Sequence, residues 1–512
     1  MTENFKSPDA LSGGRPVRTI TAGVWLAAGL AGCALQPPTA PVTTPVPTAW
    51  QAPLPHNGSL ADLSAWWQQQ NDPLLTELIM AAETVSPTVA TARSNIEQAR
   101  VARIVSGAAL LPRIDSNVNV TRGRSNPVNG AQLPIATTAT AAVQASWEID
   151  IFGLNGSQRD ADQQRFEGSQ ADWHGARVSV AAETANQYYA LRACEKLLAV
   201  ARSDASSRAE TSRLTDLSMK AGFTAPATAA LARASAAEGR NNAAQQAALC
   251  EVDVKALVAL TAYEEPALRQ RLAASPPDAI QETAPPVISV PAQALAQRPD
   301  IFKAAREVDA AHADVGYARA LRYPRLGLNG SLSSSKSWTN NGSQRFETWS
   351  VGPLQLTLPP LDGGASKANV NAAIARYDNA AAQYRGAVRQ AVREVEEALV
   401  NLDSTADRTQ SAAVAAEGYS ASFTGTEARY KSGLANLVEL EDARRTLLAS
   451  QSNVVNLQRQ RRSAWVSLYR ALGGGWTVDS AAPETADAAP PPAFSPSPTA
   501  DTTLLSTARP GS

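Results

Sequence analysis

The side chains with the most suggestive chemistry are two carboxylates, Glu439 and Asp442, which follow a glycine turn at Gly433. Residues three apart project from one face of an α-helix. If copies of the chain surround a narrow passage, these side chains would form two stacked carboxylate rings that admit cations and disfavour anions. The alternative is a solvated helix face, which charged residues usually occupy, and we expect Glu441 to be such a surface residue.

A cysteine near the N-terminus predicts a lipid anchor. Arg15 and Arg18 precede a short apolar stretch over 19–30, which ends in Leu-Ala-Gly-Cys at Cys33 and resembles a bacterial lipobox. We therefore expect residues 1–32 to be a signal peptide, Cys33 to be lipidated, and the Pro/Thr-rich residues 33–57 to be a tether. An ordinary signal peptide with a chance cysteine is the alternative.

The other two cysteines, Cys194 and Cys250, lie at equal sequence separation on either side of Gly222. In an antiparallel helical hairpin that turns at Gly222, such residues lie side by side. The spacing supports the hairpin and permits a disulfide in an oxidising compartment, although two neighbouring free thiols remain possible.

The composition argues against an enzyme. The chain has three histidines, at positions 56, 174 and 312, with no metal-ligand spacing, nucleophile elbow or phosphate-binding loop. The formal net charge is −1, so there is no basic field to attract nucleic acid. We expect no catalytic residue, no metal, no cofactor and no nucleic-acid partner.

The chain contains an internal repeat of about 211 residues, in which helix, strand, strand, long helix, turn and helix follow one another twice. Four landmarks keep step: Pro87 with Pro299, Pro112 with Pro324, Gly153 with Gly363, and Gly222 with Gly433. We expect a first repeat over 58–285 and a second over 286–476. The Ala/Pro/Ser/Thr-rich residues 477–512 read as a disordered tail.

Four segments alternate between apolar and polar residues, at about 113–122, 141–151, 325–333 and 348–358. Each is about as long as a tilted transmembrane strand, and a phase slip near Pro353 predicts a bulge. Polar loops are expected within each pair, at about 123–134 and 335–345. The pattern is typical of an outer-membrane barrel, with a small soluble sheet as the alternative. Four strands cannot close such a barrel, so several copies must share it.

Long breaker-free segments predict helices of unusual length, over 156–220 and 364–431. Each is about as long as two shorter helices placed end to end: 225–262 with 87–111, and 437–472 with 299–323. These helices would continue a barrel wall as a hollow cylinder, whereas a soluble coiled-coil rod has no use for strands at one end.

Several short motifs occur in a specific order: Trp66-Trp67 with Asp72-Pro73, Trp147 to Gly153, Arg298 to Ile301, Asp362 to Gly364, and Tyr430 to Gly433 running into Leu440 to Ala443. In this order the chain resembles the TolC/OprM superfamily of outer-membrane efflux factors, and specifically its NodT-like lipoprotein branch. The resemblance covers about residues 66–476. It implies an α+β membrane protein that contributes four strands to a trimeric 12-stranded outer-membrane β-barrel, continued by a long α-helical periplasmic barrel.

The resemblance also assigns roles to particular residues. It implies that Glu439 and Asp442 are the acidic gate and that Tyr430 and Arg445 hold the periplasmic helix tips shut. The turns at Gly222 and Gly433 would contact a periplasmic adaptor protein, which in turn joins an inner-membrane pump.

The function expected from this resemblance is passive conduction of small molecules across the outer membrane of a Gram-negative bacterium. The lipobox at Cys33 favours small-molecule efflux over protein secretion, and the expected inner-membrane pump is of RND type. The alternatives are an outer-membrane channel for type I protein secretion, or a non-conducting lipoprotein scaffold that spans the envelope.

Overall fold

A computed structural model describes residues 42–52, 66–70, 72–124, 135–275, 291–340 and 342–476. The predicted signal peptide over 1–32, the lipidation site Cys33, the tail over 477–512 and most of the expected loop over 123–134 lie outside the described residues.

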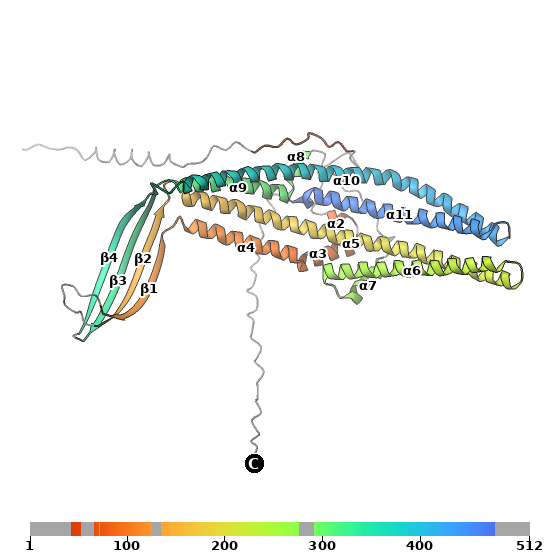
Figure 1. Ribbon diagram of the computed structural model, residues 1–512, viewed down its shortest axis with the longest axis horizontal. Coiled ribbons are helices and arrows are strands. Elements are labelled where there is room, and N and C mark those ends of the chain that lie inside the picture. Colours follow the sequence, from red (N-terminus) through yellow and green to blue (C-terminus); the bar gives the residue numbers. More distant parts are fainter. Residues whose placement is uncertain are drawn as a thin grey trace, which may run out of the picture. The chain divides into compact units, whose positions relative to one another are not determined.

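The same order of elements occurs twice along the chain (Figure 1). Each set consists of a 22-residue helix, two strands, a 67-residue helix and a helix of 35 or 36 residues. The first set comprises α4 (Pro87–Ala108), β1 (Arg113–Gly123), β2 (Ala136–Ile149), α5 (Leu154–Lys220) and α6 (Pro226–Thr261). The second comprises α9 (Pro299–Ala320), β3 (Arg325–Thr339), β4 (Gly342–Thr357), α10 (Ala365–Lys431) and α11 (Leu437–Ala471).

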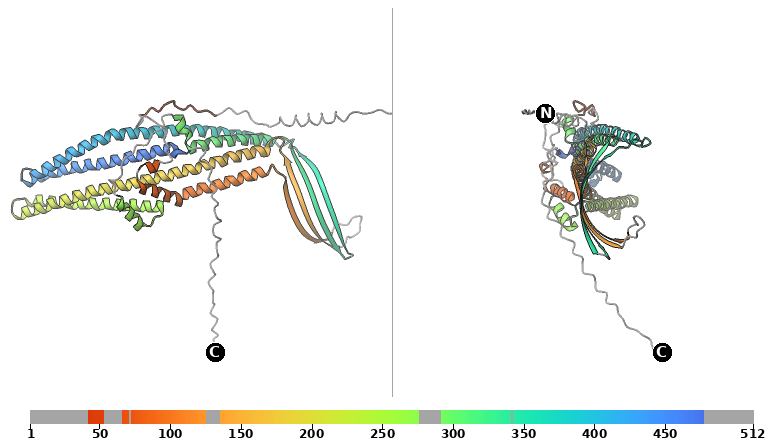
Figure 2. Two further views of the ribbon diagram at one scale, coloured as in Figure 1. Left: turned by 180° about the vertical axis from the view of Figure 1, so that it is seen from behind. Right: turned by 90° about the vertical axis from the view of Figure 1, so that its left-hand side faces the viewer.

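Each long helix lies beside two shorter ones, as predicted. The helix α5 packs along α4 and α6, and α10 packs along α9 and α11 (Figures 1 and 2). The two sets are joined because α9 and α11 also pack against α5. The helices therefore form one packed layer, with the strands at one end and the two hairpin turns at the other.

Helix boundaries agree with the prediction within a few residues because proline, glycine and short polar side chains define them. Ser86 caps α4 through its side chain, and Pro87 occupies the first turn, where a missing N–H costs little. Asn436 caps α11 in the same way by accepting a hydrogen bond from the Glu439 N–H at 2.9 Å.

The four strands form one antiparallel sheet in the order β1-β2-β3-β4. The predicted bulge is present: Leu328 pairs with Leu354 and Gly330 with Val351, so Gly352 and Pro353 together oppose Asn329. An extra residue in one strand disturbs the ladder locally and increases the twist.

The predicted limits of three strands are wrong. The second strand begins at Ala136 rather than 141 and ends at Ile149, the third extends from Arg325 to Thr339, and the fourth begins at Gly342. The polar loop expected over 335–345 is mostly strand. Serine and threonine runs hide the alternation in the sequence, but they pair across strands, as Thr140 does with Ser335 at 3.0 Å.

The outer edges of β1 and β4 have no strand partner among the described residues. Large apolar side chains on these two strands are exposed in the single chain, including Val118, Val120, Trp349, Val351 and Leu356. Among the described residues, no helix is both long and apolar enough to cross a lipid bilayer.

The main core lies midway along the helices, where short elements cover α5, α6, α10 and α11. These elements are α2 (Trp66–Gln69), α3 (Pro73–Val85), α7 (Glu265–Ala274), α8 (Pro291–Ala296) and a 3₁₀ turn over Gly473–Gly475. Trp66 packs against Trp465 and Tyr469 at ring-centroid distances of 6.1 and 5.4 Å. This aromatic cluster attaches the N-terminal segment to the end of α11.

The prediction of a tether over 33–57 is wrong for residues 42–52. Trp50 and Ala52 are buried in the main core, and Val42 and Val46 pack on smaller clusters with residues of α9 and α10. The Gln51 and Ala52 N–H groups donate to the Glu396 carboxylate at 2.7 and 2.8 Å. Because one carboxylate accepts two backbone N–H groups and Trp50 is buried, this segment is fixed to α10.

Candidate gate at the hairpin tips

Both helical hairpins turn on a glycine with a left-handed backbone. Gly222 has φ +84° and Gly433 has φ +76°. The Phe223 N–H donates to the Ser218 carbonyl at 2.9 Å, and the Leu434 N–H donates to the Arg429 carbonyl at 2.8 Å. This hydrogen-bond pattern closes the C-terminus of a helix and requires a residue that tolerates positive φ, so glycine occupies both turns.

The two predicted gate carboxylates lie in the first turns of α11, directly after the Gly433 turn. Their side chains are 46% (Glu439) and 62% (Asp442) exposed in the single chain. Glu439 accepts a hydrogen bond from the Asn436 side chain at 2.8 Å and lies 3.6 Å from Arg429. Both acids are therefore partly exposed at the tip, where Glu439 lies beside Arg429 and Asp442 beside Arg445.

The predicted locking residues have different surroundings. The Tyr430 hydroxyl lies 2.8 Å from Thr215 Oγ1, so it connects α10 to α5. Arg445 is exposed and pairs with Asp442 of its own helix at 3.2 Å. Among the described residues of one chain, Arg445 makes no ion pair with another helix, so its locking role between neighbouring copies stays a prediction.

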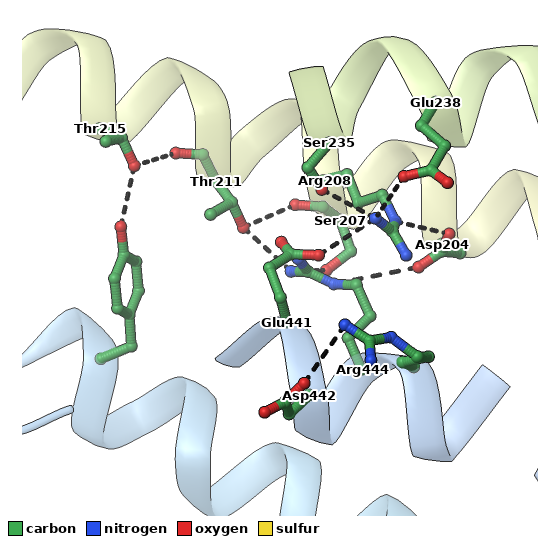
Figure 3. Close-up of polar contacts among 12 residues, drawn as sticks. Asp204, Ser207, Arg208, Thr211, Thr215, Ser235, Glu238, Glu441, Asp442 and Arg444 are labelled. Atoms are coloured by element: carbon green, nitrogen blue, oxygen red, sulfur yellow. Dashed lines mark hydrogen bonds and ion pairs between the residues drawn. The ribbon is translucent and has the colours of Figure 1, made fainter. Parts of the chain in front are cut away.

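A group of buried polar contacts in this region was not predicted from the sequence. Asp204 and Arg208 of α5 meet Glu441 and Arg444 of α11 in a buried cluster (Figure 3). The expectation that Glu441 is a surface residue is wrong, because its side chain is only 14% exposed. The available signal was spacing: Arg444 follows the buried Leu437 and Leu440 on the apolar face of α11.

The two remaining cysteines form a disulfide between α5 and α6. Cys194 and Cys250 have Cα atoms 5.5 Å apart and are separated by 56 residues of sequence. The bond lies in the main core and joins the first hairpin well away from its tip. The second hairpin has Thr405 and Arg461 about 211 residues further on, so it has no such bond there.

No group of His, Cys, Asp or Glu side chains within the described part of the chain is arranged to hold a metal ion.

Comparison with known proteins identifies the family. The family model described as outer membrane efflux protein matches residues 78–263 and 290–474. The chain belongs to this family. The two matched segments correspond to the two sets of helices and strands.

Individual relatives agree with this assignment. The chain is 30% identical to outer membrane protein OprJ of Pseudomonas aeruginosa over 467 residues, which cover 88% of this chain and 95% of OprJ. It is 26% identical to nodulation protein T of Rhizobium leguminosarum bv. trifolii over 463 residues, covering 87% and 95% of the two chains. The resemblance to the NodT-like branch is thus confirmed.

A solved structure supports the fold. The outer-membrane channel OprN matches with a TM-score of 0.76 and 26% identity, covering 87% of this chain and all of that chain. As a member of the outer membrane efflux protein family, the chain is an efflux channel of the Gram-negative outer membrane.

Proposed function

We propose that this chain is the outer-membrane channel of a tripartite efflux system and that three copies share one 12-stranded barrel. The outer edges of β1 and β4, which have no partner strand within the described part of the chain, carry this proposal. Unsatisfied backbone groups are not tolerated in lipid, so these edges must pair with strands of other copies. Three copies give twelve strands, an even number that closes with cyclic symmetry.

The proposed mature protein begins at Cys33, after removal of residues 1–32, and is held at the outer membrane by the acylated cysteine as well as by the barrel. Two structural repeats, over 58–285 and 286–476, each contribute two strands and one helical hairpin. Their equal helix lengths, 22 and 67 residues in both sets, support this duplication.

The proposed gate lies at the periplasmic tips, where Glu439 and Asp442 of three chains form two carboxylate rings. Tyr430 and Arg445 hold the tips closed. A periplasmic adaptor contacts the turns at Gly222 and Gly433 and favours the open form, because it binds that form more tightly than the closed one. An inner-membrane pump of RND type supplies the cargo.

Conduction through this channel is passive, needs no cofactor and makes or breaks no bonds in the cargo. We infer that small molecules are the substrates, because a lipoprotein signal accompanies the efflux family assignment. Type I protein secretion and a non-conducting scaffold are the rival functions.

Planar-bilayer conductance tests the gate. The purified wild-type chain should give small, cation-selective currents. The double variant Glu439→Ala/Asp442→Ala should conduct several-fold more and lose most of its cation preference, because the charged constriction is removed.

The matched control removes two carboxylates from α10 far from the tip, with Asp403→Ala/Asp407→Ala, and should leave the conductance close to wild type. Unchanged conductance and selectivity in Glu439→Ala/Asp442→Ala would remove these residues from the gate. A wild-type chain that forms no pores would favour the scaffold.

A further inference from the structure

Four charged side chains are buried between the two hairpins, on the tip side of the disulfide. We call them the latch cluster: Asp204, Arg208, Glu441 and Arg444. Their side chains are 7%, 9%, 14% and 3% exposed, respectively. The charges of the two guanidinium groups and the two carboxylates balance. Burying charged groups has a large desolvation cost unless each is paired with an opposite charge.

Arg208 connects three helices. Its Nε donates to Asp204 Oδ2 at 2.8 Å within α5. Its Nη1 donates to Ser235 Oγ on α6 at 2.8 Å and to Glu441 Oε2 on α11 at 3.0 Å. The side chain thus joins both helices of the first hairpin to the gate-bearing helix of the second.

Arg444 approaches the same cluster from α11 (Figure 3). Its Nη2 donates to Ser207 Oγ at 3.1 Å and to Thr211 Oγ1 at 3.0 Å, both on α5. It also pairs with Glu441, and its guanidinium lies 5.5 Å from the centre of the Phe423 ring on α10. Arg208 and Arg444 therefore cross-connect all four helices.

The two helices of the first hairpin, α5 and α6, are held tightly together near these contacts. The disulfide Cys194–Cys250 joins α5 to α6. Gly239 of α6 lies so close to α5 that an added Cβ would be 2.8 Å from Arg208 Cδ and 3.2 Å from Ala205 Cα. This close approach holds Arg208 in place as it reaches toward α11.

The latch cluster and the gate carboxylates occupy opposite sides of α11. At 3.6 residues per turn, Glu441 and Arg444 lie about 160° around the helix from Glu439 and Asp442. A rotation or axial shift of α11 that moves the carboxylates must therefore disturb the ion pairs behind them. Buried ion pairs add little net stability compared with apolar residues, but they can fix the register of packed helices.

We propose that the latch cluster positions the gate. It fixes the rotation and register of α11 against α5 so that Glu439 and Asp442 face the passage in the closed channel. Opening then requires the Arg208–Glu441 contact and the Arg444 contacts with α5 to separate. This inference rests on the proposed gating function, and it adds four positioning residues that lie behind the gate rather than in it.

The test is single-channel recording of Glu441→Gln in the full chain. This change leaves two buried guanidinium groups with one carboxylate, so the closed packing becomes less favourable. We expect the open probability to rise roughly tenfold. Cation selectivity should be retained because Glu439 and Asp442 are unchanged, which separates this effect from loss of the gate carboxylates.

The control is Glu238→Gln, which removes a carboxylate 3.9 Å from Arg208 whose side chain is 68% exposed. Exposed pairs contribute little, so its open probability should match wild type. In the double variant Arg208→Gln/Glu441→Gln the contact between the two side chains is already absent, so its open probability should be no higher than that of the more open single variant. Additive increases from the two single variants would show that Arg208 and Glu441 act independently and would contradict the inference.

The outcomes are distinct. A conducting wild type with identical open probability in Glu441→Gln and Glu238→Gln overturns this inference alone. A wild type that does not conduct overturns the proposed function and this inference together. If Glu441→Gln does not fold, Glu441→Asp replaces it. That variant keeps the charge but shortens its reach, and it should raise the open probability by a smaller factor. A wild-type open probability in Glu441→Asp then contradicts the inference.

Discussion

Asp362 controls the entry into α10 through hydrogen bonds to its carboxylate. Its oxygens accept from the Ser366 side chain, from the Ser366 N–H at 2.8 Å and from the Gly364 N–H at 2.9 Å. These bonds favour the charged form and lower the pKa of Asp362 to about 2, with the Ser366 hydroxyl as the largest cause. Asp150 accepts from the Gly156 N–H at 2.7 Å at the corresponding entry into α5.

This geometry predicts a pH-dependent effect of Asp362→Asn. A carboxyl group whose pKa is lower in the folded state stabilises the fold above its unfolded pKa of about 4, and that contribution is lost as the pH falls toward about 2. Thermal unfolding should show Asp362→Asn less stable than wild type at pH 7, with the difference shrinking below about pH 4. A difference that stays constant with pH would argue against the hydrogen-bonded carboxylate.

At the scale of single residues, the sequence located the tip but not its internal contacts. Glycine spacing placed Glu439 and Asp442 directly after the turn. Whether Arg444 or its neighbour Arg445 contacts α5 depends on which side of α11 each arginine occupies. Arg444 lies on the apolar face of α11 and Arg445 does not, and a motif match alone directs attention to the exposed one.

At the scale of helices and strands, the boundaries could be predicted where a proline or glycine interrupts the sequence pattern. Helix ends were accurate where Pro87, Gly222 or Gly433 interrupts the pattern. Strand ends were wrong where serine and threonine continue a strand, because their hydroxyls pair across the sheet without apolar alternation, as between Ser333 and Thr348 at 2.7 Å. The docking of residues 42–52 was missed because it depends on Glu396, more than 300 residues away in sequence.

The close approach of α5 and α6 at Gly239 gives a prediction about these two helices. Gly239→Ala would place a methyl group 2.8 Å from Arg208 Cδ and 3.2 Å from Ala205 Cα, so the Arg208 side chain must shift and the two helices must move slightly apart. We expect a loss of about 1–3 kcal/mol in unfolding free energy, as for other overpacked sites.

The matched control is Gly418→Ala in α10, where an added Cβ meets no atom within 4 Å. That variant should be neutral or slightly stabilised, because alanine favours helix more than glycine does. Chemical denaturation of both variants measures the difference. Equal stability of the two would contradict tight packing at Gly239.

At the scale of the whole molecule, the sheet is incomplete in one chain. In the part of the chain that the structure describes, the four strands leave two edges without a partner, and large apolar side chains on these edge strands are exposed. The family assignment places these strands in an outer-membrane efflux channel. The number of strands and the need for other copies at the sheet edges could be derived from the sequence. The number of chains in the barrel, three, rests on the resemblance to known efflux factors.

Native mass spectrometry of the full chain, extracted from outer membranes in mild detergent, tests the shared barrel most directly. We expect a complex of three identical chains, because strands of neighbouring copies are needed to pair with the outer edges of β1 and β4. A monodisperse single chain that still conducts ions would contradict it.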